Sequence, residues 1–271
     1  MWLVWLSIAI VFLIIIIIYI FFHKKTRSWL EPPKTNMKNT IDNSNFFSRM
    51  SSIDLKARGA SSIDEYKKTY KKAISNFSEQ EADVLDDLVK KTSMLLTSYE
   101  KISRIPWKII KSSGIEEDMP HTIGDIIVLP AGFFKENRDK QVETLIHEKI
   151  HVYQRIHPIE TSKLLALLGF KHWKQGRSVA LLRNNPDNDS SVYSLGGIAQ
   201  AQVYTSQEPR SIRDSEVKTL EGEGSWNLPV QQKEHPYEIM ACWVSHEVIG
   251  EGPEHNSQRR DNIRSWMNSF L

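Results

Sequence analysis

The sequence predicts an α+β domain that follows an apolar N-terminal segment. Residues 2–22 contain no charged side chain. Residues 105–110 and 122–130 are rich in β-branched residues, which is typical of strands. Apolar residues recur at helical spacing elsewhere, most clearly over residues 142–153. A chain of 271 residues is long enough to bury a substantial core around such elements.

The N-terminal segment, residues 1–22, is predicted to be a single-pass transmembrane anchor, because an uncharged run of this length can cross a bilayer as a helix. A cleaved signal peptide would need a preceding basic residue, a shorter run and small residues at a cleavage site, and none is present. The basic flank His23–Arg27 predicts that the rest of the chain lies on the cytoplasmic side. Glycosylation sequons at Asn76 and Asn188 leave the lumenal orientation open.

Charge is unevenly distributed along the chain. Residues 23–60 hold eight Lys and Arg against three Asp and Glu, a net +5, whereas residues 61–271 hold 27 against 30, a net −3. We interpret residues 23–60, with their many Asn and Ser, as a basic juxtamembrane linker that is either solvated or attracted to anionic lipids. The slightly acidic remainder argues against nucleic acid as a partner. The single cysteine, Cys242, excludes an intrachain disulfide and fits a reducing compartment.

Two helix starts open the main domain. Ser62 and Ser78 are each followed three residues later by a glutamate, which is the form of a capping box. They predict helices over residues 62–74 and 78–99. We expect residues 61–100 to form a helical hairpin that packs on the rest of the domain.

The segment 122–130 is the clearest predicted strand, β-branched and ended by a proline. If it lies at a sheet edge, Gly124, Ile126 and Val128 would mark a strand whose free backbone groups bind an extended peptide. The alternative, a central core strand, is equally compatible with the sequence.

The next helix carries the pattern H-E-x-x-H at residues 147–151. On a helix, His147 and His151 lie on one face a turn apart, so both imidazoles can bind one zinc ion. Glu148, about 100° further round the helix, can reach a water on that ion and act as general base. The alternative is a solvated helix whose histidines are incidental.

The remaining elements follow from turn signals and periodicity. The expected order is a helix over 159–170, a loop over 183–191, a hairpin over 192–206 turning at Gly196–Gly197, an irregular rim or lid over 207–233, a helix over 236–249 and a last helix over 257–270.

The segments His147–Arg155 and Glu234–Ala241 together resemble the zincin-like peptidases encoded by large DNA viruses and some microbes. Arg183–Asp187 is similar to an intervening stretch in those proteins. The resemblance implies a zincin-like fold of the gluzincin type over residues 61–271, with a small sheet, the H-E-x-x-H helix and a later glutamate-bearing helix. It also implies one zinc ion and hydrolysis of peptide bonds.

A catalytic zinc site needs three protein ligands and an open position. The resemblance gives the third place to Glu238, in an apolar stretch of the later helix. His157 is the competing candidate, because it stands six residues after His151, as in metzincins, but Gln154 occupies the position where their chain turns at a glycine. Cys242 is a further alternative, either as a fourth ligand or as an inhibitory group.

Catalysis would also need a partner for the oxyanion of the tetrahedral intermediate. The candidates are Tyr204 and His235, with Tyr193 and Tyr237 as further options. Glu234 and Asp125 are the candidates for a carboxylate that orients a ligand histidine.

The sequence thus predicts a membrane-anchored zinc metallopeptidase that acts on a peptide or protein. The rival interpretation is a catalytically silent zincin-like domain that binds a peptide or serves as an anchored structural module. A purely structural zinc site, closed by a fourth ligand, is a third interpretation.

Overall fold

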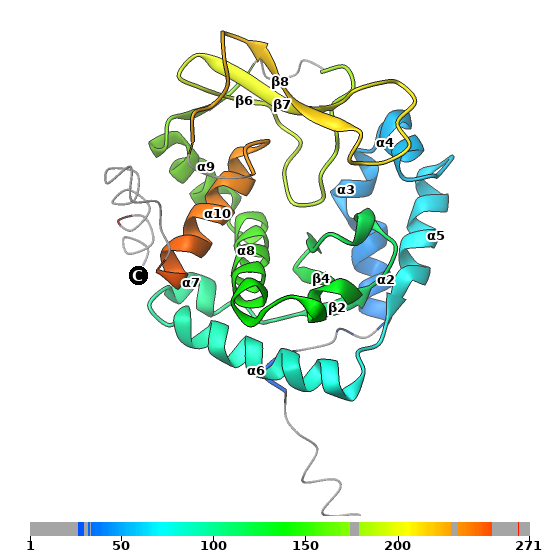
Figure 1. The fold of residues 1–271 in the computed structure, drawn as a ribbon, viewed down its shortest axis with the longest axis vertical. Helices are drawn as coiled ribbons and strands as arrows, with labels where there is room; N and C mark the ends of the chain where they lie inside the picture. The colour runs from blue at the N-terminus through cyan, green and yellow to red at the C-terminus, as the bar shows by residue number, and fades with distance from the viewer. Residues whose placement is uncertain are drawn as a thin grey trace, which may run out of the picture.

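The computed structural model describes residues 27–29, 32, 34–173, 179–228, 232–250 and 265. Two four-stranded sheets and a set of surrounding helices confirm the α+β class (Figure 1). The predicted anchor lies outside the described residues, as does all of the predicted helix 257–270 except Ser265. Within the described chain, no helix is both long enough and apolar enough to span a bilayer.

The first sheet has the strand order β1-β2-β4-β3. Its strands are β1 (Ile74–Ser75), β2 (Ile109–Ser112), β3 (His121–Ile123) and β4 (Ile126–Pro130). β2 and β4 are parallel, with Ile110 opposite Val128, whereas β1 and β3 run antiparallel to their neighbours. Every residue of β4 is buried, which is typical of a strand at the centre of a sheet.

The predicted strand 122–130 is in fact a hairpin. The chain turns at Gly124, whose φ of +61° is readily adopted only by glycine, and returns as β4. β4 is hydrogen-bonded on both sides, so Ile126 and Val128 cannot offer free backbone groups to a peptide. Ile126 and Val128 therefore cannot pair with a substrate strand, and Gly124 lies in the turn. The central-strand alternative holds for β4, whereas β3 lies at the edge of the sheet.

Alternate side chains of the first sheet face two separate cores. One face contributes Ile110, Ile126 and Val128 to a core with helices that precede the sheet in sequence. Those helices are α2 (Lys34–Asn43), α3 (Asn45–Ser48), α4 (Ser52–Ala57) and α5 (Ile63–Ala73). The other face packs on α6 (Glu79–Leu95), α7 (Glu100–Ser103), α8 (Arg138–Ile156) and the helices that follow.

This arrangement corrects two predictions. α5 and α6 begin at the predicted serine caps, but they lie on opposite faces of the sheet and do not form a packed hairpin. Residues 34–60 are not a linker, because their helices bury Met37, Ile41 and Phe47 in the core. Their abundant serines misled the prediction, since Ser44 and Ser51 are N-caps.

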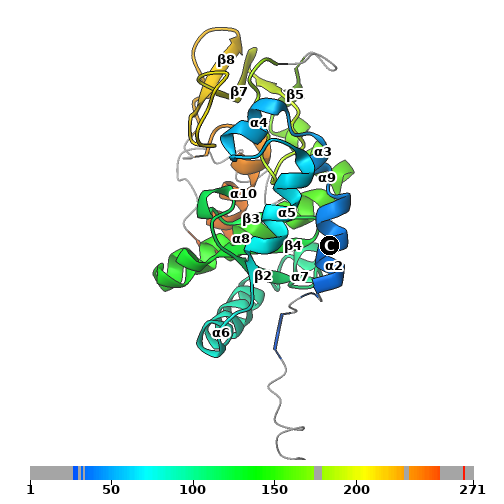
Figure 2. The same cartoon turned by 90° about the vertical axis from the view of Figure 1, so that its right-hand side faces the viewer.

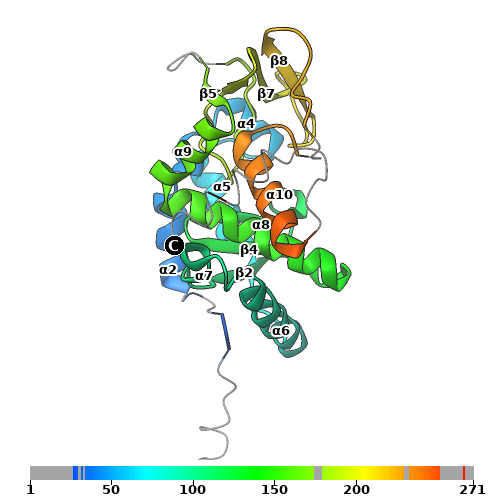
Figure 3. The ribbon, with the colours of Figure 1, turned by 90° about the vertical axis from the view of Figure 1, so that its left-hand side faces the viewer.

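The second sheet is antiparallel throughout, in the order β5-β6-β7-β8. Its strands are β5 (Phe170–His172), β6 (Tyr193–Leu195), β7 (Ile198–Tyr204) and β8 (Ser215–Glu221). The predicted turn at Gly196–Gly197 is confirmed, but β8 replaces part of the predicted irregular rim. Figures 2 and 3 show this sheet at the end of the molecule opposite α6.

Two helices at the centre position the candidate site. α8 ends at Ile156, as Pro158 predicts, and α9 (Pro158–Leu167) follows directly. α10 (Pro236–Ile249) packs against α8 in the middle of the molecule (Figure 1). Short 3-10 turns, Glu116–Asp118 and Ala131–Lys135, flank the β3–β4 hairpin.

Candidate metal centre

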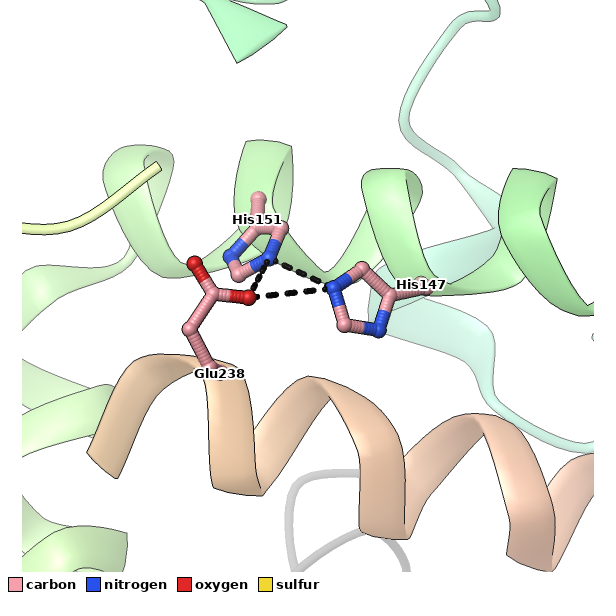
Figure 4. Close-up of side chains that lie close together, drawn as sticks. All are labelled: His147, His151 and Glu238. Carbon is pink, nitrogen blue, oxygen red and sulfur yellow. Dashed lines mark hydrogen bonds and ion pairs between the residues drawn. The ribbon is translucent and has the colours of Figure 1, made fainter. Parts of the chain in front are cut away.

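The two histidines of the motif meet Glu238 between α8 and α10 (Figure 4). The Nε2 atoms of His147 and His151 lie 3.0 Å apart. The Oε2 atom of Glu238 lies 3.2 Å from the first of these nitrogens and 3.1 Å from the second. Three side chains from two helices, 91 residues apart in the chain at the widest, therefore point their donor atoms at one place.

The chemistry of this donor set fits a small divalent cation. Bonds of about 2.0–2.1 Å in tetrahedral geometry place ligand atoms roughly 3.3 Å from one another, close to the separations observed here. Two imidazole nitrogens and a carboxylate oxygen are also an established set for catalytic zinc.

A buried amide holds His151 in the tautomer that a ligand needs. The Nδ1 atom of His151 lies 2.8 Å from Oε1 of Gln154, while Nε2 of Gln154 donates to the carbonyl of Tyr237 at 2.9 Å. The second bond orients the amide so that its oxygen faces the imidazole. Nδ1 of His151 is therefore the donor, and Nε2 keeps its lone pair for the cluster.

A second amide orients the carboxylate of Glu238. Nδ2 of Asn185 donates to Oε1 of Glu238 at 3.0 Å, which leaves Oε2 directed at the histidines. The backbone N–H of Asp187 donates to Oδ1 of Asn185 at 2.9 Å and so sets the orientation of this amide. The carboxylate is thus pre-positioned by the loop between β5 and β6.

The electrostatics of the cluster favour a positive charge at its centre. Burial alone would lower the pKa of His151, but the carboxylates of Glu238 and Asp187 raise it to about 10. Burial likewise acts to raise the pKa of Glu238, but the neighbouring histidines hold it well below its ordinary value. A cation bound between these groups would be stabilised by the same carboxylate charges.

Glu148 lies beside the cluster and is almost fully buried. Its Oε2 atom is inaccessible and has no hydrogen-bond partner among the described residues. Burial raises the pKa of this carboxyl well above its ordinary value, and the charge of Asp187 adds to the effect. A buried carboxyl oxygen with no protein partner is what a group reserved for a substrate or water would show.

A cavity of about 910 Å³ gives access to these groups. We call it the cleft. Its wall includes His147, Glu148 and Glu238, together with Asn185 and Asp187 of the loop that orients the cluster. The start of β3 also lines it, through His121. A space of this size accommodates several residues of an extended peptide or a comparable ligand.

The competing ligands lie elsewhere. His157 sits at the junction of α8 and α9 and stacks on Tyr153, with ring centroids 4.6 Å apart, outside the cluster. The sulfur of Cys242 lies 3.9 Å from Nδ1 of His147, the nitrogen turned away from the cluster. The geometry therefore selects Glu238 as the third member of the donor set.

The candidate oxyanion groups do not line the cleft as the described residues define it. The hydroxyl of Tyr204 is buried and donates to Asp54 at 3.1 Å. His235 caps α10, and its Nε2 atom lies 3.2 Å from Asp189. Tyr193 donates to the same aspartate at 2.9 Å, and Asp189 also interacts with Tyr237. The structure therefore does not bring the oxyanion candidates to the cleft. Tyr204 bonds Asp54 and Arg58. The other three side chains surround Asp189 near the start of α10.

Neither of the two carboxylates that were suggested to orient a ligand histidine contacts one. Asp125 pairs with Lys108 at the β3–β4 turn. Glu234 lines the cleft, but it makes no hydrogen bond to a ligand histidine in the described structure. Burial and the charge of Glu238 raise the pKa of Glu234 to about 7.

Sequence reasoning missed Gln154, Asn185 and Asp187 as groups that build the site. Gln154 attracted notice only because it replaces a glycine. Asn185 and Asp187 fall in a stretch whose composition predicts a loop, which is correct, but the loop is buried. Two signals were available. A glutamine stands three residues after a motif histidine, and i and i+3 residues share a helix face. Arg183–Asp187 also resembles a stretch of the zincin-like proteins.

Comparison with protein-family models, with curated proteins and with solved structures found no match to this chain. The geometry of His147, His151 and Glu238 is therefore the basis for assigning a function.

Proposed function

We propose that this chain is a membrane-anchored zinc-dependent metallopeptidase with a zincin-like catalytic domain. The observation that carries the proposal is the convergence of His147, His151 and Glu238 within 3.2 Å of one another. The buried, unpartnered oxygen of Glu148 beside them supports a catalytic rather than a purely structural site. The first sheet, the motif helix and the glutamate-bearing helix are the elements that the sequence resemblance implies.

In this proposal the two histidines and Glu238 hold the zinc ion. When bound, such an ion supplies a Lewis acid that polarises a carbonyl and acidifies water. Gln154 keeps the lone pair of His151 directed at the donor cluster, and Asn185 does the same for one oxygen of Glu238.

Glu148 is the proposed general base and later the general acid. Its carboxylate accepts the proton of the attacking water and passes it to the amine of the leaving fragment. Burial favours this exchange because a carboxyl in a dry environment gains and loses a proton more nearly at neutral pH. The cleft would hold the substrate chain on either side of the scissile bond.

The test uses the purified full chain and its Glu148→Gln variant. We expect one bound zinc per chain in both proteins, measured by elemental analysis, and cleavage of an unfolded protein substrate by the wild type only. Loss of a general base should lower the rate by at least about 100-fold. The exposed Glu79→Gln substitution on α6 is the matched control and should cleave at the wild-type rate.

Two results would count against the peptidase. Equal cleavage by wild type and Glu148→Gln would remove Glu148 from the mechanism. Stoichiometric zinc with no cleavage of any unfolded protein would favour the rival proposal of a catalytically silent, peptide-binding or structural domain.

A further inference from the structure

A buried arginine lines the cleft without a matching carboxylate. Arg183 is 8% exposed and belongs to the cleft wall together with Glu148 and Glu238. Its Nη1 atom donates to Oε1 of Gln202, whereas its Nε atom is inaccessible and has no hydrogen-bond partner among the described residues. Removing a guanidinium from water is costly unless an anion pairs with it and its N–H groups are bonded. Arg183 therefore lacks the anionic partner that a buried arginine normally has.

The carboxylates beside the loop of Arg183 are bonded to other groups. Arg58 lies 2.7 Å from the carboxylate of Glu116 and 3.5 Å from that of Asp54. Asp54 also accepts from the backbone N–H of Asn184 at 2.9 Å. Both acids are therefore already paired with one arginine, and neither forms an ion pair with Arg183 in the described structure.

Glu234 compensates the charge of Arg183 only in part. Both residues line the cleft, but no ion pair joins them among the described residues. Burial and the charge of Glu238 raise the pKa of Glu234 to about 7, although the charge of Arg183 acts to lower it. A carboxyl that is half protonated near neutral pH supplies only part of a negative charge. A carboxylate brought by a ligand would supply the rest.

The backbone holds Arg183 in a fixed place near the donor cluster. Its N–H donates to the carbonyl of Gln202 at 3.0 Å, which attaches this end of the loop to β7. Two residues later, Asn185 donates to Glu238 at 3.0 Å. The guanidinium is thus positioned before a ligand arrives, so that little conformational entropy is lost when one binds.

We propose that Arg183 is a specificity-determining residue of the cleft and binds a carboxylate of the substrate near the scissile bond. The inference rests on the proposed peptidase function and names its substrate class, which is peptides with a carboxylate beside the cleaved bond. That carboxylate belongs either to an acidic side chain or to a free C-terminus. The planar fork of an arginine matches the two oxygens of such a group. Two further acids of the cleft leave room for it, because Asp187 accepts from the backbone of Thr122 and Glu143 pairs with Lys140.

The test first maps, by mass spectrometry, the bonds that the zinc-loaded full chain cleaves in reduced and alkylated serum albumin. The preferred sequence is then synthesised as two matched pairs of peptides. One pair carries either its Asp or Glu or the corresponding Asn or Gln, and the other pair has either a free or an amidated C-terminus. The ratio of kcat/KM within each pair is measured for the wild type and for Arg183→Gln, Arg183→Lys and Arg210→Gln. Each ratio compares two substrates of one protein sample, so partial misfolding of a variant does not change it.

We expect one of the two pairs to show a ratio of about 10 or more in the wild type, and that pair identifies the source of the carboxylate. In Arg183→Gln the ratio should fall close to 1, through KM rather than kcat, because the contact binds substrate and transition state alike. Arg183→Lys keeps the charge but not the fork and should retain part of the ratio. Arg210→Gln, at an exposed position, should retain all of it. Ratios near 1 for both pairs in the wild type overturn the inference, as does a ratio that Arg183→Gln leaves unchanged.

Absence of any cleavage would contradict the peptidase, and a binding measurement then decides the inference about Arg183. Fluorescein-labelled heptapeptide pools with Asp or Asn at the central position, and with a free or an amidated C-terminus, are titrated with the zinc-loaded chain and followed by anisotropy. Tighter binding of a carboxylate pool by the wild type than by Arg183→Gln supports the inference. Equal binding by the two proteins overturns it.

Discussion

At the scale of single residues, the candidate centre is organised by two amides as much as by its three donors. Gln154 accepts from His151, and Asn185 donates to Glu238. Neither amide carries charge, and both are almost fully buried, Asn185 at 8% exposure. Each amide fixes one of the several orientations that its neighbour, the imidazole of His151 or the carboxylate of Glu238, could otherwise adopt. Buried amides suit this role because each is itself held by a backbone group.

Replacing Asn185 should therefore weaken metal binding without removing a ligand. In Asn185→Ala, Oε1 of Glu238 loses its partner and the carboxylate can rotate away from the histidines. Loss of such an orienting group typically costs 10–100-fold in metal affinity, and we expect a loss of about 10-fold or more. Competition with a chromophoric zinc chelator measures it. Asn39→Ala, at an exposed position on α2, is the matched control. An unchanged affinity in Asn185→Ala would show that Glu238 needs no such support.

At the scale of elements, the turn between β3 and β4 depends on one glycine that meets a neighbouring helix. A Cβ at Gly124 would lie 2.7 Å from Cγ2 of Thr40 on α2, and Thr40 is held by a 3.0 Å hydrogen bond from its hydroxyl to Asn36. Gly59 has a similar φ of +66° but open space around it. Comparing the two glycines separates two terms in the free energy of unfolding: the strain of a positive φ, which both share, and the contact with Thr40, which only Gly124 has.

Both alanine substitutions should lower the free energy of unfolding, Gly124→Ala by more. The positive φ alone costs about 1–2 kcal/mol, which is the whole of the effect expected for Gly59→Ala. The excess at Gly124 should disappear when Thr40→Ala is added, because the double variant removes the contact. Urea denaturation of Gly124→Ala, Gly59→Ala, Thr40→Ala and the double variant Gly124→Ala/Thr40→Ala measures these changes in the free energy of unfolding. If Thr40→Ala does not reduce the cost of Gly124→Ala, the contact with α2 is not what requires glycine.

A buried ion pair joins α4 to the 3-10 turn at the wall of the cleft. Nε and Nη2 of Arg58 donate to the carboxylate of Glu116 at 2.7 and 2.8 Å. Burial acts to raise the pKa of Glu116, but the charge and hydrogen bonds of Arg58 lower it to about 2. The same guanidinium donates to the carbonyl of Asn184, which connects the pair to the loop that orients the cluster of His147, His151 and Glu238.

This pair predicts a loss of stability in acid. Because the pKa of Glu116 is lower in the folded chain than its ordinary value of 4.5, the folded state binds fewer protons. The lowered pKa of Glu116 contributes about 3 kcal/mol to the free energy of unfolding. This contribution is present above pH 4.5 and is lost as the pH falls toward 2. In Glu116→Gln, the free energy of unfolding should drop by about 3–5 kcal/mol at pH 7, since Arg58 stays buried and keeps only Asp54, 3.5 Å away, as a charged partner.

The measurement is urea denaturation of wild type and Glu116→Gln at several pH values. The difference between the two proteins should shrink from pH 7 to pH 3. The exposed Glu79→Gln variant should follow the wild-type curve throughout. A difference that stays constant with pH would mean that Glu116 does not titrate with a lowered pKa.

At the scale of the whole molecule, the elements nearest the motif were the most predictable. α8 has apolar periodicity and a proline two residues past its end, and α10 begins with a proline, so these limits follow from sequence. Glu238 could be placed beside the histidines only through the resemblance to known zincin-like proteins. No local pattern relates residues 91 apart, so the convergence itself is a property of the fold.

The wrong predictions have one physical cause: amino-acid composition does not show which residues are buried. Residues 34–60 and 183–191 are rich in Asn and Ser. The first segment nevertheless buries Met37, Ile41 and Phe47, and the second is largely buried, because caps and buried arginines satisfy polar groups there. The hairpin at Gly124 was read as one strand because both arms are β-branched. Tyr204 and His235 were chosen by residue type, although their surroundings decide their role.

The overall stability of the molecule should depend on the metal, because the proposed ligands connect two helices that are distant in sequence. α8 packs on the first sheet, whereas α10 is reached through the second sheet and its loops. A cation held by both helices stabilises only the folded arrangement, by about 2.7 kcal/mol at a free concentration 100 times the Kd. Chelation should lower the Tm by about 5–10 °C in a protein of this size.

Calorimetry of the wild type with and without chelator tests this. The Glu238→Gln variant should show a low Tm that no longer responds to chelator. An equal response in wild type and variant would place the bound metal somewhere other than between α8 and α10.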